Sequence, residues 1–124
     1  DFATRCQICL DREASLSQNV FLLFAIVDVT TALLMALDKD AAVSRRLLAI
    51  LCTLLQHRFP RVRSYTAHQL YLLLLEGRLD VSTDTLFDTI LKTSWLSEMN
   101  EWQGVPALVA EGLNIVQEFK SLNN

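Results

Sequence analysis

The stretch LLQHRFPRVR, residues 54–63, separates two segments whose apolar residues recur at helical spacing. Before it, residues 41–57 carry a wide apolar stripe formed by Val43, Leu47, Leu51, Leu54 and Leu55. Because proline has no N–H to donate and suits only the first turn of a helix, a new helix is predicted to begin near Pro60. In that helix one apolar face is formed by Ala67, Leu70, Tyr71 and Leu74. The stretch therefore predicts two consecutive helices joined by a tight turn.

Composition favours helices in the rest of the chain as well. Of the 124 residues, 52% are hydrophobic, and there are only three Gly and two Pro. Val, Ile and Thr are scattered and do not alternate with polar residues in the period of two that a half-buried strand needs. We therefore expect one all-α domain over residues 1–124, long enough to bury a hydrophobic core.

Six helices with short connections, alternating in direction, are predicted along the chain. The first four are a short helix within residues 2–13, a second from about 17 to 37, a third over 41–57, and a fourth from Pro60 to a glycine stop at Gly77.

The last two predicted helices are separated by a longer connection. Ser82 or Thr83 can cap the fifth helix. Residues 93–104, which contain both tryptophans, have no clear period and are predicted to form a loop. Pro106 then begins one final helix, whose inward side chains are predicted to be Leu108, Val109, Leu113, Val116 and Phe119.

The turn after the third predicted helix resembles the start of the second helix of a HEAT repeat. In such a repeat Phe59 and Pro60 set the turn, Val62 fills the groove between paired helices, and Ala67 lets two backbones approach closely. Arg63 can bridge to carbonyl groups or acids of a neighbouring repeat. Repeats of this kind cannot bury their own apolar face and must stack. We therefore expect a HEAT/armadillo-like α-solenoid fragment of five or six helices.

A wider set of residues is similar to the C-terminal region of the tubulin-folding cofactor D family. It begins with LLQHRFP at residues 54–60 and continues with Arg63, Thr66, Ala67, Gln69, Tyr71, Leu74 and Leu75. Downstream, a helix that ends in Thr93-Ser94-Trp95 fits the next helix of that family. The resemblance extends from about Leu47 to Trp95.

This resemblance implies a tubulin chaperone that is not an enzyme and holds no cofactor. Members of the family are helical-repeat scaffolds that hold β-tubulin and act with other tubulin-folding cofactors and a small Arf-like GTPase. They assemble and take apart the α/β-tubulin heterodimer, so a cytoplasmic, cytoskeleton-associated protein is implied. The alternative is a HEAT or armadillo adaptor for another partner, such as a transport or trafficking scaffold, because repeats alone do not specify the partner.

Charge is distributed unevenly along the chain, whose net charge is −3. Residues 41–75 contain five arginines and no acid, whereas residues 76–118 contain eight acids and two basic residues. Arg58, Arg61 and Arg63 fall at one inter-helix turn and predict a basic ridge for an acidic partner surface such as tubulin. Alternatively, they cap helix ends or pair with acids of the final third. Nucleic acid is disfavoured, since the chain is acidic and no aromatic residues alternate with the basic ones.

The apolar run from Val20 to Leu37 is about as long as a membrane-spanning helix. Asp28 lies near its middle, beside Thr30 and Thr31, and a charge at that depth is costly in lipid. We therefore expect a buried central helix with no membrane insertion, in which Asp28 has a polar partner or lies at an exposed edge.

No residue pattern predicts catalysis or metal binding. Cys6 and Cys9 have the spacing of half a zinc site, but no second pair exists, and neither His57 nor His68 has ligand spacing. We expect reduced cysteines that pack as small apolar residues, a His57 that bonds carbonyl groups at a helix end, and a His68 at the surface. A nucleophile elbow, a phosphate loop and a carboxylate pair are all missing from the sequence, so an enzyme or regulatory subunit is disfavoured.

The N-terminal third is the most apolar part of the chain, which starts at Asp1 without the features of a signal peptide. We expect a C-terminal fragment of a longer helical-repeat protein. Because a solenoid repeat buries its apolar face against the repeat before it, the fragment is expected to expose an apolar patch on its N-terminal side and to self-associate through it. The patch is expected among Phe21, Leu22, Leu23, Phe24, Ile26 and Val27.

Overall fold

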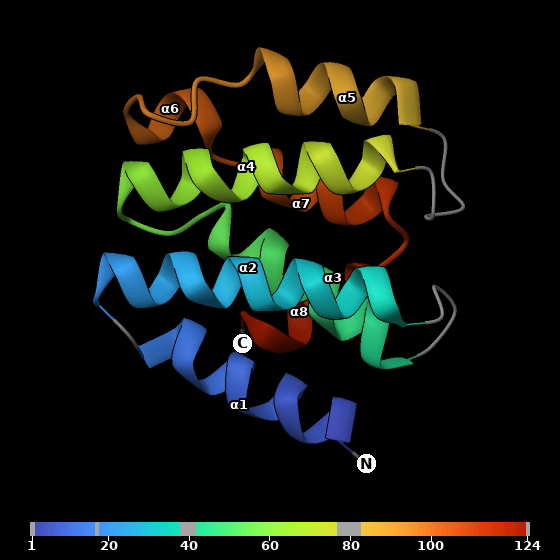
Figure 1. Ribbon diagram of the computed structural model, residues 1–124. Helices are drawn as coiled ribbons and strands as arrows, with labels where there is room; N and C mark the ends of the chain where they lie inside the picture. Colours follow the sequence, from blue (N-terminus) through green and yellow to red (C-terminus); the bar gives the residue numbers. More distant parts are fainter. Residues whose placement is uncertain (1, 17, 38–41, 77–82, 124) are drawn as a thin grey trace.

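The computed structural model describes residues 2–16, 18–37, 42–76 and 83–123. Within these ranges the chain is all-α, as predicted, and has no strand (Figure 1). The helices are α1 (Phe2–Leu16), α2 (Val20–Ala36), α3 (Ala42–Leu54), α4 (Pro60–Leu75), α5 (Thr83–Lys92), α6 (Met99–Trp102), α7 (Val105–Gly112) and α8 (Val116–Leu122).

Helices α2 and α4 lie side by side and run in the same direction, while α3 runs back behind them (Figure 1). α2 begins at Asn19, whose side chain accepts hydrogen bonds from the amides of Phe21 and Leu22 and so caps the helix. The rings of Phe24 and Tyr65, with centroids 4.6 Å apart, join the first halves of α2 and α4. The chain thus builds two parallel outer helices on one inner helix.

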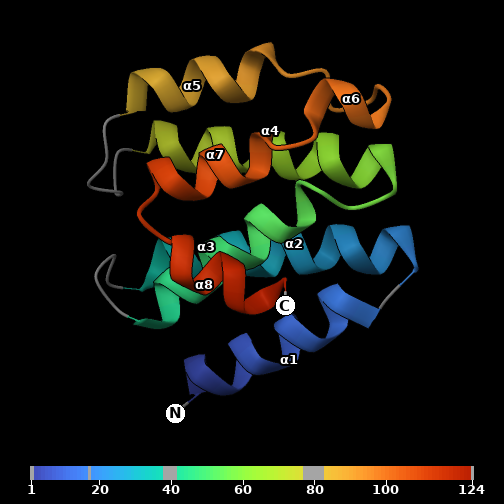
Figure 2. The same cartoon turned by 180° about the vertical axis from the view of Figure 1, so that it is seen from behind.

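Helix α3 is the centre of the molecule, so the prediction that the apolar run of α2 forms the buried central helix is wrong. Helix α3 packs against α1, α2 and α4, and also against α7 and α8, which return to it from the end of the chain (Figure 2). Arg45 and Glu118 tie α3 to α8 with an Nη2–Oε1 distance of 2.8 Å. A solenoid repeat contacts only its neighbours in sequence, whereas the last helices here close around the first inner helix. The buried residues of α3 are Ser44, Leu47, Leu48, Ala49, Ile50, Leu51, Cys52 and Leu54.

The segment predicted to be a loop contains the short helix α6, and both of its tryptophans are buried. Trp95 Nε1 donates to the carbonyl of Ile90 at 3.0 Å, and Trp102 Nε1 donates to the carbonyl of Ser97 at 3.2 Å. The two large indole rings, whose N–H groups are hydrogen-bonded, hold this segment against the core. The sequence did not predict this packing, because the segment has no apolar residues at helical spacing.

The prediction of one final helix is wrong, because the segment forms two separate helices, α7 and α8. The break lies at Asn114, which has a φ of 61°, a left-handed conformation that asparagine tolerates better than most residues. It turns the chain so that Ile115 is fully buried and α8 packs on α3. Leu108 does not face inward as predicted, since it is 58% exposed on α7.

Other boundaries differ by a few residues from the prediction. The first helix is longer than expected, and Pro60 begins α4 as expected. Gly77 and Ser82 lie outside the described residues, as does the side chain of Thr83. Of the free cysteines, Cys52 is buried in α3 and Cys6 is half-buried on α1. The packing role of Cys9 is wrong, because α1 turns it to the surface with Arg5, Ile8 and Arg12.

Candidate protein-binding surface

The turn between α3 and α4 is held by its own side chains. Phe59 stands at the N-cap position of α4 without a capping side chain, and Pro60 occupies the first turn. His57 Nδ1 accepts a hydrogen bond from the Phe59 amide at 3.1 Å, and the two rings lie 4.9 Å apart. His57 was expected to bond carbonyl groups, but its ring accepts, because the first amides of a helix lack internal partners. Burial lowers the pKa of His57, and the nearby Arg58 and Arg63 lower it further.

The next residues of the turn face the interior. Val62 is fully buried and Ala67 nearly so. Between them Thr66 is also buried, and its hydroxyl donates to the carbonyl of Val62 at 2.7 Å. These positions lie on the face of α4 that packs inward, where small and branched side chains allow close helix contact.

Arg63 is a buried connector and not part of a surface ridge. It is 3% exposed, and its guanidinium donates to the carbonyls of His57 at 2.7 Å, Trp95 at 2.9 Å and Ser97 at 3.0 Å. Its Cζ lies 4.2 Å from the centroid of the Trp102 ring. The planar fork of arginine suits several acceptors at once. Arg63 therefore pins the start of α4 to the segment before α6.

Arg58 and Arg61 remain at the surface, so the structure does not bring the three turn arginines together. The Arg58 guanidinium lies 5.0 Å from the centroid of the Phe59 ring, and Arg61 lines a shallow hollow with Phe24, Tyr65 and Leu96. Among the ion pairs of the described residues, the arginine that meets an acid of the final third is Arg45 on α3.

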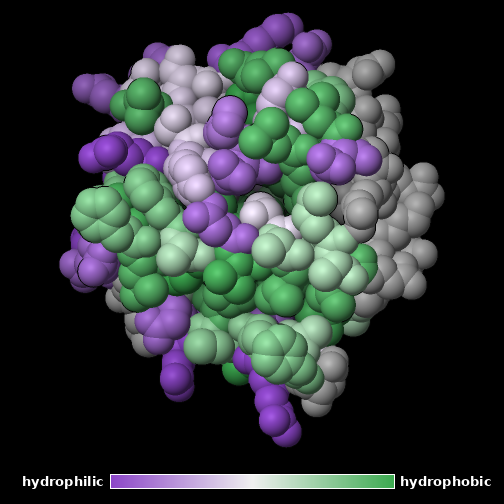
Figure 3. Space-filling model, viewed as in Figure 1, coloured by the Kyte–Doolittle hydropathy of each residue, from purple (hydrophilic) through white to green (hydrophobic). Residues whose placement is uncertain are grey.

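The outer face of α2 is apolar and exposed. In Figure 3 apolar residues gather across the part of this view formed by α1 and α2. Phe21 is 80% exposed, and Leu22 and Val29 are also exposed. One charged residue, Asp28, lies among them. We call this face the α2 outer stripe, and its residues are Phe21, Leu22, Ala25, Asp28, Val29, Ala32 and Ala36.

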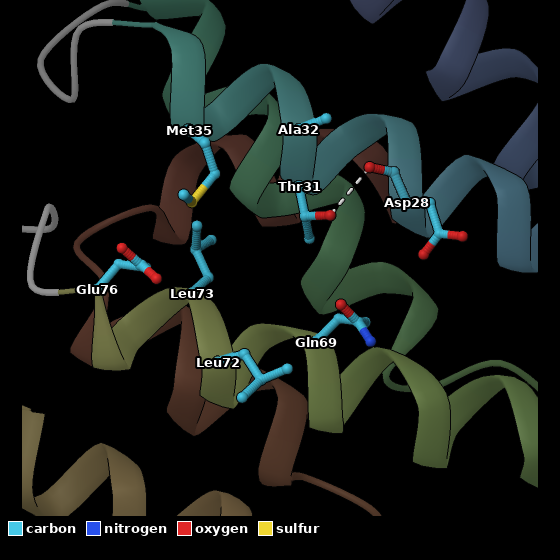
Figure 4. A pocket seen from close by; sticks show the side chains of 8 residues that line it. All are labelled: Asp28, Thr31, Ala32, Met35, Gln69, Leu72, Leu73 and Glu76. Atoms are coloured by element: carbon cyan, nitrogen blue, oxygen red, sulfur yellow. Dashed lines mark hydrogen bonds between the residues drawn. The ribbon is translucent and has the colours of Figure 1, made fainter.

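Beside this stripe, α2 and α4 enclose a groove of about 200 Å³, which we call the α2–α4 groove (Figure 4). Met35 from α2 and Leu73 from α4 point toward one another across it, and Asp28 and Glu76 lie at its opposite ends. Its lining residues are Asp28, Thr31, Ala32, Met35, Gln69, Leu72, Leu73 and Glu76.

Asp28 is held in place by the expected polar partner and also lies at an exposed edge. Its carboxylate accepts a hydrogen bond from the Tyr65 hydroxyl of α4, which raises the pKa of Tyr65. Thr31 Oγ1 donates to the backbone carbonyl of Asp28 at 2.9 Å. A carboxylate has acceptor sites for more than one donor, so Asp28 keeps capacity to meet a cation at the surface.

The described residues contain neither a metal-binding cluster nor a membrane-spanning helix. No group of three or more His, Cys, Asp or Glu side chains there is placed to hold a metal ion. No helix in those ranges combines the length and the apolar character needed to cross a membrane.

Comparison with known proteins adds no relative. No protein-family model matches the chain, no curated protein matches its sequence, and no solved structure matches its fold. The resemblance to tubulin-folding cofactor D therefore stays a prediction.

The sequence located the apolar N-terminal third but not its exposed face. Of the residues expected to form the patch, Leu23, Ile26 and Val27 are buried, and Phe21 and Leu22 are exposed. The α2–α4 groove was missed. The signal that could have found the stripe is the spacing of Ala25, Asp28, Val29, Ala32 and Ala36, which share one face of a helix.

Proposed function

We propose that this chain is a non-catalytic, protein-binding segment of a tubulin-folding chaperone of the cofactor D type. Its role is to help capture β-tubulin and to help assemble and take apart the α/β-tubulin heterodimer. The α3–α4 turn carries the proposal, because it holds the residues of the resemblance. Pro60 in the first turn, the buried Val62 and the carbonyl-bridging Arg63 support it, since a repeat turn of this kind needs each of them.

We propose further that α2 to α4 form HEAT-like repeat structure. Two parallel outer helices with an antiparallel inner helix behind them support this, because corresponding helices of successive repeats stack in parallel. In this proposal α7 and α8 close the end of the stack by covering α3. A terminal repeat requires such a cover, since otherwise its apolar face would meet water.

The partner contacts proposed for this function centre on Arg58 and Arg61. Both are exposed at the α3–α4 turn, and two cations on one turn favour an acidic protein surface such as that of tubulin. Other tubulin-folding cofactors and a small Arf-like GTPase are proposed as further partners, and the cytoplasm, in association with the cytoskeleton, as the location.

The test is equilibrium binding of the purified chain to purified α/β-tubulin at low and physiological salt. We expect the double variant R58E/R61E to bind roughly tenfold more weakly, with the larger difference at low salt, because exposed charges are screened by ions. The matched control is R5E/R12E, which makes the same charge change on the exposed face of α1.

Failure of the unmodified chain to bind tubulin would contradict the proposed function and favour an adaptor for another partner. Equal loss in the two double variants would show that net charge, and not the α3–α4 turn, governs the interaction.

A further inference from the structure

We propose that the α2–α4 groove and the α2 outer stripe together form a docking surface for an amphipathic helix of a partner protein, and that this helix carries Lys or Arg beside its apolar face. The inference rests on the protein-binding part of the proposed function, and it does not require the partner to be tubulin.

The shape of the surface fits a helix. Ala25, Ala32 and Ala36 are exposed along α2 and have short side chains, so a second helix can approach α2 closely at these positions, on either side of the larger Val29. Helices that bind in grooves place apolar anchors at a spacing of three and four residues. The stripe on α2 has this spacing.

The groove is sized for a side chain and not for a small molecule. Its volume of about 200 Å³ is below the roughly 300–1,000 Å³ of small-molecule sites. Met35 and Leu73 form apolar walls that suit an aliphatic anchor, and Thr31 and Gln69 line the groove with hydrogen-bonding groups. One anchor residue of a docked helix would fill it.

Charge selects the kind of helix. Asp28 and Glu76 lie at the two ends of the groove, and among the residues that the structure describes no Lys or Arg lines it or belongs to the α2 outer stripe. A helix with acidic flanks would meet like charge, whereas a helix with Lys or Arg at the edge of its apolar face would meet two carboxylates.

The other occupants fit less well. A two-fold dimer packs the same patch against itself, which would bring the carboxylates of two copies together. A membrane surface draws on Lys and Arg next to the apolar face of the bound helix, and the stripe has neither.

The test uses two synthetic 18-residue peptides made of Leu, Ala and Gln with a Leu stripe at helical spacing. One has two Lys at the edge of the stripe and the other has two Glu at the same positions. Binding is followed by fluorescence anisotropy, and the site by amide chemical shifts of the whole chain. We expect micromolar binding of the Lys peptide with shifts on α2 and α4, and roughly tenfold weaker binding of the Glu peptide.

Variants of the chain then test whether the two carboxylates cause the Lys preference and whether the open approach to α2 is needed for binding. D28N/E76Q is expected to reduce the preference for the Lys peptide by roughly tenfold, and Ala32→Gln to weaken both peptides by filling the approach to α2. Leu91→Gln is the control, because Leu91 is exposed on α5 away from the groove.

Three outcomes would overturn the proposal. The first is no binding of either peptide, and the second is a Lys preference that survives D28N/E76Q. The third is a dimer in sedimentation equilibrium that dissociates in Val29→Glu, which would make a second copy the occupant. This test contains no tubulin, so the two proposals can fail separately. A chain that binds the Lys peptide but not tubulin would contradict the proposed function and would still support the docking surface.

Discussion

Helices α2 and α3 are both apolar, but the fold uses their apolar residues differently. In α3, eight of thirteen residues are buried, because α1, α2, α4, α7 and α8 surround it. In α2, five of seventeen residues are buried, and the outer stripe faces water with Phe21 and Val29 exposed. A helix that is apolar on all sides is normally buried on all sides. Burial in the core therefore explains the apolar residues of α3. The exposed apolar residues on the outer face of α2 do not stabilise the core, and we assign them to the proposed partner.

The largest expected effect tests the α3 side of this comparison. Leu51 is fully buried in the last turn of α3. Leu51→Ala is expected to lower the free energy of unfolding by about 2–5 kcal/mol, through lost burial and the cavity that remains. Urea denaturation measures the change. Val29→Ala on the outer face of α2 is the matched control, with an expected cost below about 1 kcal/mol, and equal losses would break the comparison.

A smaller loss is expected at Arg63, which ties the start of α4 to the segment before α6. Arg63→Lys keeps the charge, but one ammonium group does not reproduce the fork that serves the carbonyls of His57, Trp95 and Ser97. The free energy of unfolding is expected to fall by about 1–3 kcal/mol, because the buried carbonyl of Trp95 and the partly buried carbonyls of His57 and Ser97 lose donors.

Arg61→Lys, at an exposed position on the same helix, controls for the chemistry of this substitution. It is expected to change stability by less than about 0.5 kcal/mol. If Arg63→Lys is equally neutral in thermal and urea unfolding, Arg63 does not hold the turn.

The next effect is pH-dependent. The pKa of His57 in the folded chain is lowered from its ordinary 6.5, mainly by burial. Unfolding therefore takes up a proton as the pH falls through this region, so the contribution of His57 to stability is complete above pH 6.5 and decreases below it. We expect the free energy of unfolding to fall between pH 7.5 and 5.5, and to fall less in His57→Gln.

Protonation would also remove the Nδ1 acceptor of the Phe59 amide, which is a second reason for the same direction. Parallel pH profiles for the unmodified chain and His57→Gln would show that another group is responsible.

Sequence patterns predicted what depends on neighbours along the chain. The stripe of α3, the start of α4 at Pro60 and the all-α class follow from helical spacing and proline chemistry. The burial of Arg63 did not follow, because two of its acceptors, on Trp95 and Ser97, lie more than thirty residues away. The break at Asn114 was missed for a related reason, since packing of α8 on α3 selects that turn.

The candidate docking surface was also predictable only in its local features. An apolar N-terminal patch could be expected from composition, whereas its exact members depend on which side of α2 meets α3 and α4. The α2–α4 groove arises from residues far apart in the chain, such as Met35 and Leu73. No pattern local to either helix specifies it.

The most direct test of the account is the double variant Phe21→Ser/Val29→Ser, measured for both stability and binding of the Lys peptide. Serine has nearly the same helix propensity as phenylalanine and valine, so the change reports on the outer face and not on the helix itself. We expect the free energy of unfolding to stay within about 0.5 kcal/mol of the unmodified chain, and the peptide affinity to fall at least roughly tenfold. A loss of stability above about 2 kcal/mol, or an unchanged affinity, would contradict the claim that the outer face of α2 is reserved for a partner.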